Sequence, residues 1–302
     1  MAERVGECQA GAARGWNDGQ VLGDKCKIAP IVLKRSALPC YFAHLLGGIA
    51  PLIHDDASGC SAPGAFGAYR VMHQLGVGVL GPVFRGYSPD GDDLVALKAF
   101  HLELVPEQAS RFADALGKIV ALGAVHPSLV RSLGAGVTDG VPFVAYEYVA
   151  AESLDVASRQ QALVPVDTTL PLILQLAGAL DAAHEQGLCH GALHWRDIFA
   201  TPDLMKVSGF GVLSALEGVG LRGPLRRPFA APEQVAGSSW GGAADRFALA
   251  AVSYELLTGK RSGGADSHSA DQFAGVAGGL HSLDLTQVFA AALADDPDAR
   301  PR

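Results

Sequence analysis

From Tyr69 onward the hydrophobic and polar positions follow the pattern of a small β-sheet. Two runs, at 69–75 and 79–87, are expected to pair through the glycine-rich segment between them. A turn at 88–91 then leads into a third strand, which carries Lys98. These runs predict an antiparallel sheet at the start of the regular part of the chain.

The next segments alternate between helix and hairpin signals. Residues 107–123 read as a helix that Gly123 ends, because glycine readily adopts the left-handed conformation of a helix end. Asp139-Gly140 is a hairpin signal before a strand that ends at Tyr146. Beyond residue 148 the chain reads as helical. One face is predicted to be buried there, formed by Leu170, Ile173, Leu174, Ala177 and Leu180.

Residues 1–68 lack a sustained strand or helix period and are rich in Gly and Ala. We expect them to be a largely disordered or accessory extension. Their most apolar stretch, 40–53, is interrupted by glycine and proline and is too short to span a bilayer. The first residues carry acidic side chains and no signal peptide is predicted.

Composition narrows the classes of function. The formal net charge of −8 argues against non-specific nucleic-acid binding, which needs a basic face. Basic residues cluster at Arg222, Arg226 and Arg227, and a solvated loop is the favoured interpretation of that cluster. The five cysteines form no C-x-x-C pair, which fits free thiols in a reducing cytoplasm.

A glycine motif and a lysine strand suggest a nucleotide site. Residues 76–83 fit G-x-G-x-x-G-x-V and residues 95–98 fit V-A-I-K. Glycines let backbone amides approach phosphate oxygens, and Lys98 would supply a positive charge to them. A lone glycine motif is usually a hairpin turn, but the correctly spaced lysine strand favours the nucleotide interpretation.

Further motifs follow in a fixed order along the chain. They are His126-Pro127 after the helix, Tyr146-Glu147-Tyr148-Val149, Ala231-Pro232-Glu233, Asp245 to Leu249, and Asp296 to Pro301. In this order the chain resembles the protein kinase family, closest to bacterial Ser/Thr kinases, over residues 69–302. The resemblance implies a two-lobed α+β fold with an N-lobe at 69–147 and a C-lobe at 148–302. It also implies that Glu233 pairs with Arg300.

The family's last C-lobe helix is missing from the C-terminal end of the sequence. A truncated reading frame is one explanation.

The resemblance also assigns ligand positions. Those implied for ATP are Gly76, Gly78, Gly81, Val83, Ala96, Lys98, Glu147 and Val149. Weak ATP binding is therefore expected. Asp197 is the one acidic residue left at a metal position, so Mg²⁺ is expected to bind poorly if at all.

This chain lacks several side chains on which phosphotransfer in the family depends. In the segment aligned with H-R-D-L-x-x-x-N, Ala192 replaces the catalytic aspartate and His194 replaces the lysine that steadies the phosphoryl group. Gly209 replaces the metal-binding aspartate of D-F-G. Gly117 stands where the regulatory helix has glutamate, and Asp114 is the candidate substitute partner for Lys98.

Three functions remain open on these residues. The first is a pseudokinase that binds ATP weakly and serves as a signalling module for an unidentified protein partner. The second is an active Ser/Thr kinase, or other nucleotidyl transferase, of unusual geometry that uses Asp197 and His194. The third is a scaffold with a collapsed glycine loop that binds no nucleotide.

Overall fold

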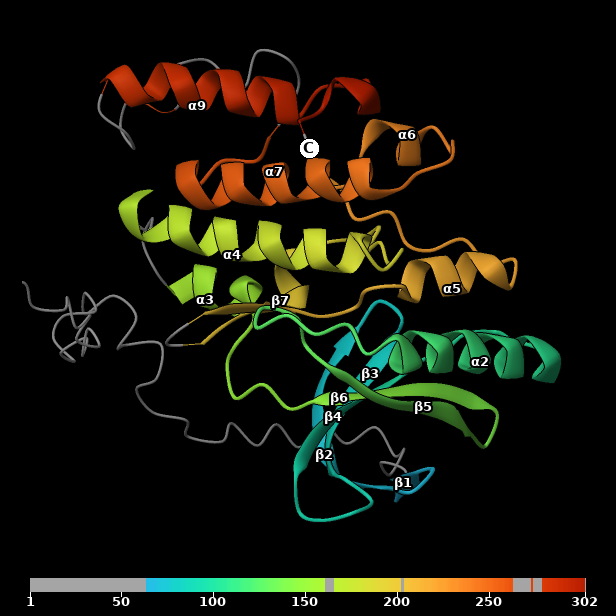
Figure 1. Cartoon of the computed structure of the whole chain (residues 1–302). Coiled ribbons are helices and arrows are strands. Elements are labelled where there is room, and N and C mark those ends of the chain that lie inside the picture. Colours follow the sequence, from blue (N-terminus) through green and yellow to red (C-terminus); the bar gives the residue numbers. More distant parts are fainter. Residues whose placement is uncertain (1–63, 161–165, 202–203, 263–272, 274–278, 302) are drawn as a thin grey trace, which may run out of the picture. The chain divides into compact units, whose positions relative to one another are not determined.

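A computed structural model describes residues 64–160, 166–201, 204–262, 273 and 279–301. Its first part is a six-stranded sheet in the order β1-β2-β3-β4-β6-β5 (Figure 1). All neighbouring strands are antiparallel. The strands are β1 (Ala65–Phe66), β2 (Tyr69–Gly78), β3 (Gly81–Tyr87), β4 (Leu94–Ala99), β5 (Ser132–Thr138) and β6 (Val141–Glu147). The sheet thus begins at Ala65, inside the range expected to be an accessory extension, whose residues 1–63 lie outside the described part.

Alternation along β4 sets the two faces of this sheet. Val95, Leu97 and Ala99 are buried, and they join a cluster that includes Phe66 and Phe143. Ala96 and Lys98 point to the opposite face because successive side chains of a strand alternate. The sheet therefore packs its core on one side and turns Lys98 toward the rest of the molecule.

Helix α2 (Pro106–Leu122) covers part of that opposite face. It ends at Gly123, which has the left-handed φ of 59° that was predicted for its end. Asp139 and Gly140 also have positive φ, as the tight hairpin between β5 and β6 requires. These local predictions are confirmed.

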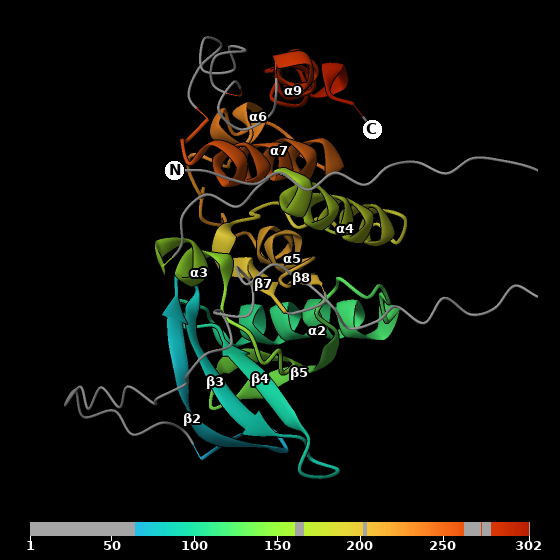
Figure 2. The same ribbon diagram turned by 90° about the vertical axis from the view of Figure 1, so that its left-hand side faces the viewer.

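The second lobe is mainly helical. Figure 1 and Figure 2 show α4 (Val166–His184) beside α7 (Gly242–Thr258), with α9 (Gly279–Ala292) next to α7. A small two-stranded sheet, β7 (Ile198–Ala200) and β8 (Met205–Val207), lies near them. The remaining elements are α3 (Leu154–Gln160), η2 (Trp195–Asp197), α5 (Val212–Gly218), α6 (Pro232–Val235) and η4 (Pro297–Ala299). This is the predicted two-lobed α+β arrangement.

The predicted buried face of α4 is wrong in part. Leu180 is buried, but Leu174 is 70% exposed and Leu170 is 38% exposed. The buried stripe consists instead of Thr169, Leu176, Ala179, Leu180 and Ala183. Apolar residues occur around most of this helix, so their spacing alone does not identify the face that meets α7.

Helix α5 joins the two lobes. Its Val212, Ala215 and Leu216 are buried in one cluster with Phe112 and Leu116 of α2. Two side chains of α2 also donate hydrogen bonds to carbonyl oxygens at the end of α5: Gln108 to Val219 at 3.1 Å and Arg111 to Gly218 at 3.2 Å. Among the residues described, no helix has both the length and the apolar character needed to cross a membrane.

Candidate nucleotide site

The glycine loop lies directly on Lys98. Gly78 pairs with Gly81 at the tip of the β2–β3 hairpin, and Lys98 Nζ donates a 2.5 Å hydrogen bond to the Gly81 carbonyl. Gly81 has a φ of 130°, and a Cβ there would lie 2.4 Å from the carbonyl oxygen of Ala99, so only glycine fits. In this conformation the loop itself occupies the hydrogen-bonding position of Lys98.

Val83 and Ala96, two of the positions implied for ATP, lie on neighbouring strands. Val83 faces Lys98 across the β3–β4 ladder, and Ala96 faces Tyr146 across the β4–β6 ladder. Val149 follows β6 and is half-buried. The outer end of the proposed site is therefore formed by backbone and small apolar side chains, whereas Gly76 is exposed on β2.

Glu147 has a second role that the sequence did not suggest. Its carboxylate accepts hydrogen bonds from Lys206 at 2.5 Å and from Arg131 Nε at 3.0 Å. Burial raises the pKa of Glu147, but the bonds from Lys206 and Arg131 outweigh it and hold the pKa below its usual range. The side chain thus ties the end of β6 to β8 and leaves only its backbone for a ligand.

Lys98 has no carboxylate partner among the residues that the structure describes. Gly117 offers no side chain, and Asp114 is exposed on α2 without an ion pair to Lys98. Burial, and after it the charge of Arg226, lowers the pKa of Lys98 to about 8, while the charge of Asp197 opposes this shift. The substitution by Asp114 that was considered is therefore not observed.

The loop at 190–197, which contains the family's catalytic position, is held by hydrogen bonds between its own residues. Ala192 contributes no side-chain functional group, and its amide donates to His190 Nδ1 at 3.2 Å. His194 Nδ1 accepts from the Arg196 amide at 3.1 Å, which caps the short helix η2. Burial and the Arg226 charge lower the pKa of His194, so its ring is neutral near pH 7.

Asp197, the remaining acidic residue at a metal position, is paired internally. Arg226 Nη1 donates to Asp197 Oδ2 at 2.6 Å, and the two side chains are only 19% and 17% exposed. Gly209 has a φ of 95° and offers no ligand atom. The resemblance implies Mg²⁺ here, but this donor set does not fit a divalent cation.

Arg226 corrects the prediction of a solvated arginine cluster. Arg222 and Arg227 are exposed as expected, whereas Arg226 is largely buried against Asp197. The clustering of three arginines in a chain with few basic residues was the signal that one of them has a special role, but their spacing does not reveal which arginine turns inward.

Sequence reasoning also missed Trp240. Its ring lies where a Cβ on Gly191 would extend, and its Nε1 donates to Glu217 of α5 at 3.0 Å.

The predicted pair of Glu233 and Arg300 is confirmed. Two parallel hydrogen bonds of 2.8 and 2.7 Å join the guanidinium to the carboxylate, and the side chains are 0% and 8% exposed. Arg300 also donates to the carbonyls of Ala294, Ala243 and Asp295 and lies over the ring of Phe247. All of these contacts hold the C-lobe together.

A second polar centre surrounds buried Asp245. Its oxygens accept hydrogen bonds from the amides of His190 and Gly191 and contact His184 Nε2 at 2.8 Å. Cys189 lies close to this group, so three metal-binding residue types meet here. Because both oxygens are already engaged in positioning the loop, the structural role explains the cluster.

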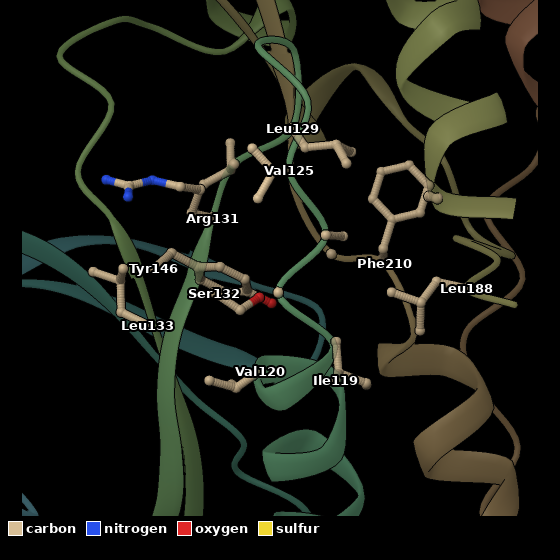
Figure 3. A pocket seen from close by; sticks show the side chains of 15 residues that line it. Ile119, Val120, Val125, Leu129, Arg131, Ser132, Leu133, Tyr146, Leu188 and Phe210 are labelled. Atoms are coloured by element: carbon tan, nitrogen blue, oxygen red, sulfur yellow. The ribbon is translucent and has the colours of Figure 1, made fainter. Parts of the chain in front are cut away.

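A cavity of about 240 Å³ lies behind Tyr146, away from the glycine loop. Figure 3 shows Phe210 and Leu188 on one side, Tyr146 and Leu133 on the other, and Ile119 and Val120 of α2 below. None of the predicted ATP-binding residues lines it. Gly209, at the position of the family's metal-binding aspartate, does line it, so the cavity borders the predicted metal position.

Comparison with known proteins agrees with this geometry. The family model of the protein kinase domain matches residues 69–290. The serine/threonine-protein kinase PknJ of Mycobacterium tuberculosis is 31% identical over 267 residues, which cover 80% of this chain and 44% of PknJ. PknI of the same organism is 28% identical over 203 residues, covering 64% of this chain and 32% of PknI. The chain thus spans less than half the length of these curated relatives.

The solved structures give the same result. The crystal structure of the M. tuberculosis PknI kinase domain matches with a TM-score of 0.62 and 26% sequence identity. The match covers 80% of this chain and 94% of that one. Sequence and fold therefore point to one family.

Proposed function

The chain belongs to the protein kinase family, and we propose that its kinase domain is impaired in phosphotransfer and acts as a nucleotide-binding regulatory module in bacterial signalling. The observation that carries this proposal is the ion pair of Asp197 with Arg226 at 2.6 Å. Phosphoryl transfer depends on positioning and on charge neutralisation by metal ions. Here the last acidic side chain at a metal position is already neutralised by the protein.

Loss of the general base supports the same function. A positioned base contributes about 10²–10⁴ to a rate, and Ala192 cannot supply one. His194 is a poor replacement, because its Nδ1 already accepts a backbone hydrogen bond and its lowered pKa reduces its basicity. These contacts weigh against the alternative of an active kinase that uses Asp197 and His194.

One observation favours a second candidate, a scaffold that binds no nucleotide. Lys98 donates to the Gly81 carbonyl, so the tip of the glycine loop stands where a phosphate would contact the lysine. ATP binding therefore requires the loop to lift and this hydrogen bond to be exchanged for one to phosphate. We favour weak binding, since a charge-assisted bond to phosphate is stronger than one to a neutral carbonyl.

The proposal is tested by phosphate incorporation from radiolabelled ATP with Mg²⁺ or Mn²⁺. The purified chain should label neither itself nor generic protein substrates above the background of Lys98→Ala. Ala192→Asp alone and Gly209→Asp alone should not restore labelling, because each leaves the other group missing. An active Ser/Thr kinase in the same assay sets the detection limit. Labelling by the wild type that disappears in both Lys98→Ala and Asp197→Ala would contradict the proposal.

A further inference from the structure

The charge of the nucleotide cleft differs in sign from the one that the family resemblance implies. Three carboxylates expected around the phosphates are replaced by Ala192, Gly209 and Gly117. The one carboxylate gained, Asp197, is matched by Arg226. Lys98 then remains as an uncompensated cation, so the cleft of this chain carries a net positive charge before any metal binds.

Arg226 has two properties of an anion-binding side chain: it is largely buried, and one of its N–H donors is not used. Its Nη1 is used by Asp197, but its Nε is buried and has no acceptor among the described residues. A buried donor without a partner is costly and usually has one in the working state of a protein. A guanidinium with unused N–H groups is well suited to phosphate oxygens.

Lys98 and Arg226 lie close enough to influence each other electrostatically. The charge of Arg226 disfavours the protonated form of Lys98, whereas that of Asp197 favours it. Two partly buried cations with only one carboxylate near them, which is paired with Arg226, repel each other, and a bound anion relieves this repulsion. Lys98 currently satisfies one N–H with the neutral Gly81 carbonyl.

We propose that Arg226 substitutes for the metal ion, and that Lys98 and Arg226 together bind the phosphates of a nucleoside triphosphate without a divalent cation. This inference rests on the proposed function and specifies its ligand as metal-free ATP. On binding, Lys98 exchanges the Gly81 carbonyl for a phosphate oxygen as the loop lifts. Arg226 keeps its bond to Asp197 and gives remaining N–H groups to the phosphates.

A divalent cation has two disadvantages in this site. It must displace Arg226 from Asp197, and the hydrogen bond between these two side chains is short, charge-assisted and largely buried. It also reduces the negative charge of ATP, which weakens the attraction to Lys98 and Arg226. The expected metal effect is therefore absent or unfavourable, opposite to that of a metal-dependent kinase site.

The experiment is calorimetric titration of the purified full chain with ATP in EDTA and in excess Mg²⁺, with adenosine as the probe that lacks phosphates. The wild type should bind ATP in EDTA, and Mg²⁺ should leave the affinity unchanged or lower it. Arg226→Ala should lower the affinity in EDTA by about tenfold or more and leave adenosine binding unchanged. Because this variant frees Asp197, Mg²⁺ should now increase its ATP affinity.

Two further variants separate this effect from loss of folding. Arg222→Ala removes an exposed arginine of the same segment and should bind like the wild type. Asp197→Asn removes the negative charge but keeps an oxygen that can accept the bond from Arg226, so it should strengthen ATP binding in EDTA. A purely structural role of the Arg226 pair predicts the opposite sign for Asp197→Asn. Melting temperatures of all variants establish that each is folded.

Several results would overturn the inference. They are an ATP affinity that rises about tenfold with Mg²⁺ in the wild type, equal binding of ATP and adenosine, no ATP binding in EDTA, or weaker binding by Asp197→Asn. None of these contradicts impaired phosphotransfer, which the labelling assay tests separately. Labelling with metal-independent binding would instead leave this inference standing and remove the proposed function.

Discussion

The carboxylates of Asp245, Asp197 and Glu233 are largely buried and accept hydrogen bonds from donors of the protein, and these contacts stabilise structure rather than perform chemistry. Asp245 positions the backbone at His190, and Arg300 holds Glu233. Asp197 with Arg226 follows the same rule at a position where the family holds metal. Removing one member of such a pair strands the other, which costs more than the pair itself contributes.

Glu233→Ala is accordingly expected to destabilise the protein by about 3–5 kcal/mol, because it leaves Arg300 buried without its carboxylate. Chemical denaturation followed by circular dichroism measures this. Glu103→Ala removes an exposed glutamate and should change stability by less than about 0.5 kcal/mol. Ala192→Asp, at the former catalytic position, should also be nearly neutral. An unchanged midpoint for Glu233→Ala would show that the pair does not form in solution.

The pKa of Lys98 predicts how metal-free ATP binding depends on pH. Burial, followed by the Arg226 charge, lowers this pKa to about 8, so the free protein loses the Lys98 proton as pH rises through 8. Phosphate binds the protonated amine, so affinity should begin to fall about one unit below pH 8 and fall by up to about tenfold per unit above it. Lys98→Arg, which stays charged, should remove this fall. A wild-type affinity that is flat to pH 10 would contradict the assignment.

At the scale of elements, single residues in the sequence determined where α2 ends and where the chain turns between β5 and β6. Gly123 ends α2 and Asp139-Gly140 makes the β5–β6 hairpin because both require positive φ, which the sequence supplies with residues that tolerate it. The buried face of α4 was not decided locally. Its exposed Leu174 and its buried Leu176 are chemically alike, and only the packing of the C-lobe core distinguishes them.

One glycine inside α2 and the glycine that follows its end give a matched test of backbone conformation. An added Cβ meets no atom within 4 Å at Gly117 or at Gly123, so packing does not distinguish the two substitutions. Gly117 is inside the helix, and Gly117→Ala should stabilise the protein by about 0.5–1 kcal/mol. Gly123 has a φ of 59°, and Gly123→Ala should destabilise it by about 1 kcal/mol. Thermal unfolding of both variants checks the opposite signs.

At the scale of the whole molecule, α5 connects the lobes through its apolar face against α2. Trp240 secures the same helix from the other side through Glu217. These contacts hold the segment that follows Gly209 against α2. The cleft is thus shaped by contacts between parts of the chain that are far apart in sequence.

Leu216→Ala tests that connection. Leu216 is 1% exposed between α5 and α2, and its truncation should cost about 2–5 kcal/mol. Leu174→Ala, at a leucine that is 70% exposed on α4, should change stability by less than about 0.5 kcal/mol. Urea denaturation monitored by tryptophan fluorescence measures both. Equal effects of the two substitutions would mean that the α5–α2 contact does not stabilise the folded protein.

Residue identities and ordered motifs were enough to predict the family, the first strands of the sheet, the end of α2, the β5–β6 hairpin and the pair of Glu233 with Arg300, but not β1, β7 or β8. These properties depend on residue identity and on motifs in a fixed order, which a sequence carries directly. The tertiary structure alone decided that Arg226 turns inward to Asp197 and that Gly81 covers Lys98. Both depend on distances between segments that no spacing rule fixes, because these segments meet only when each lobe has folded.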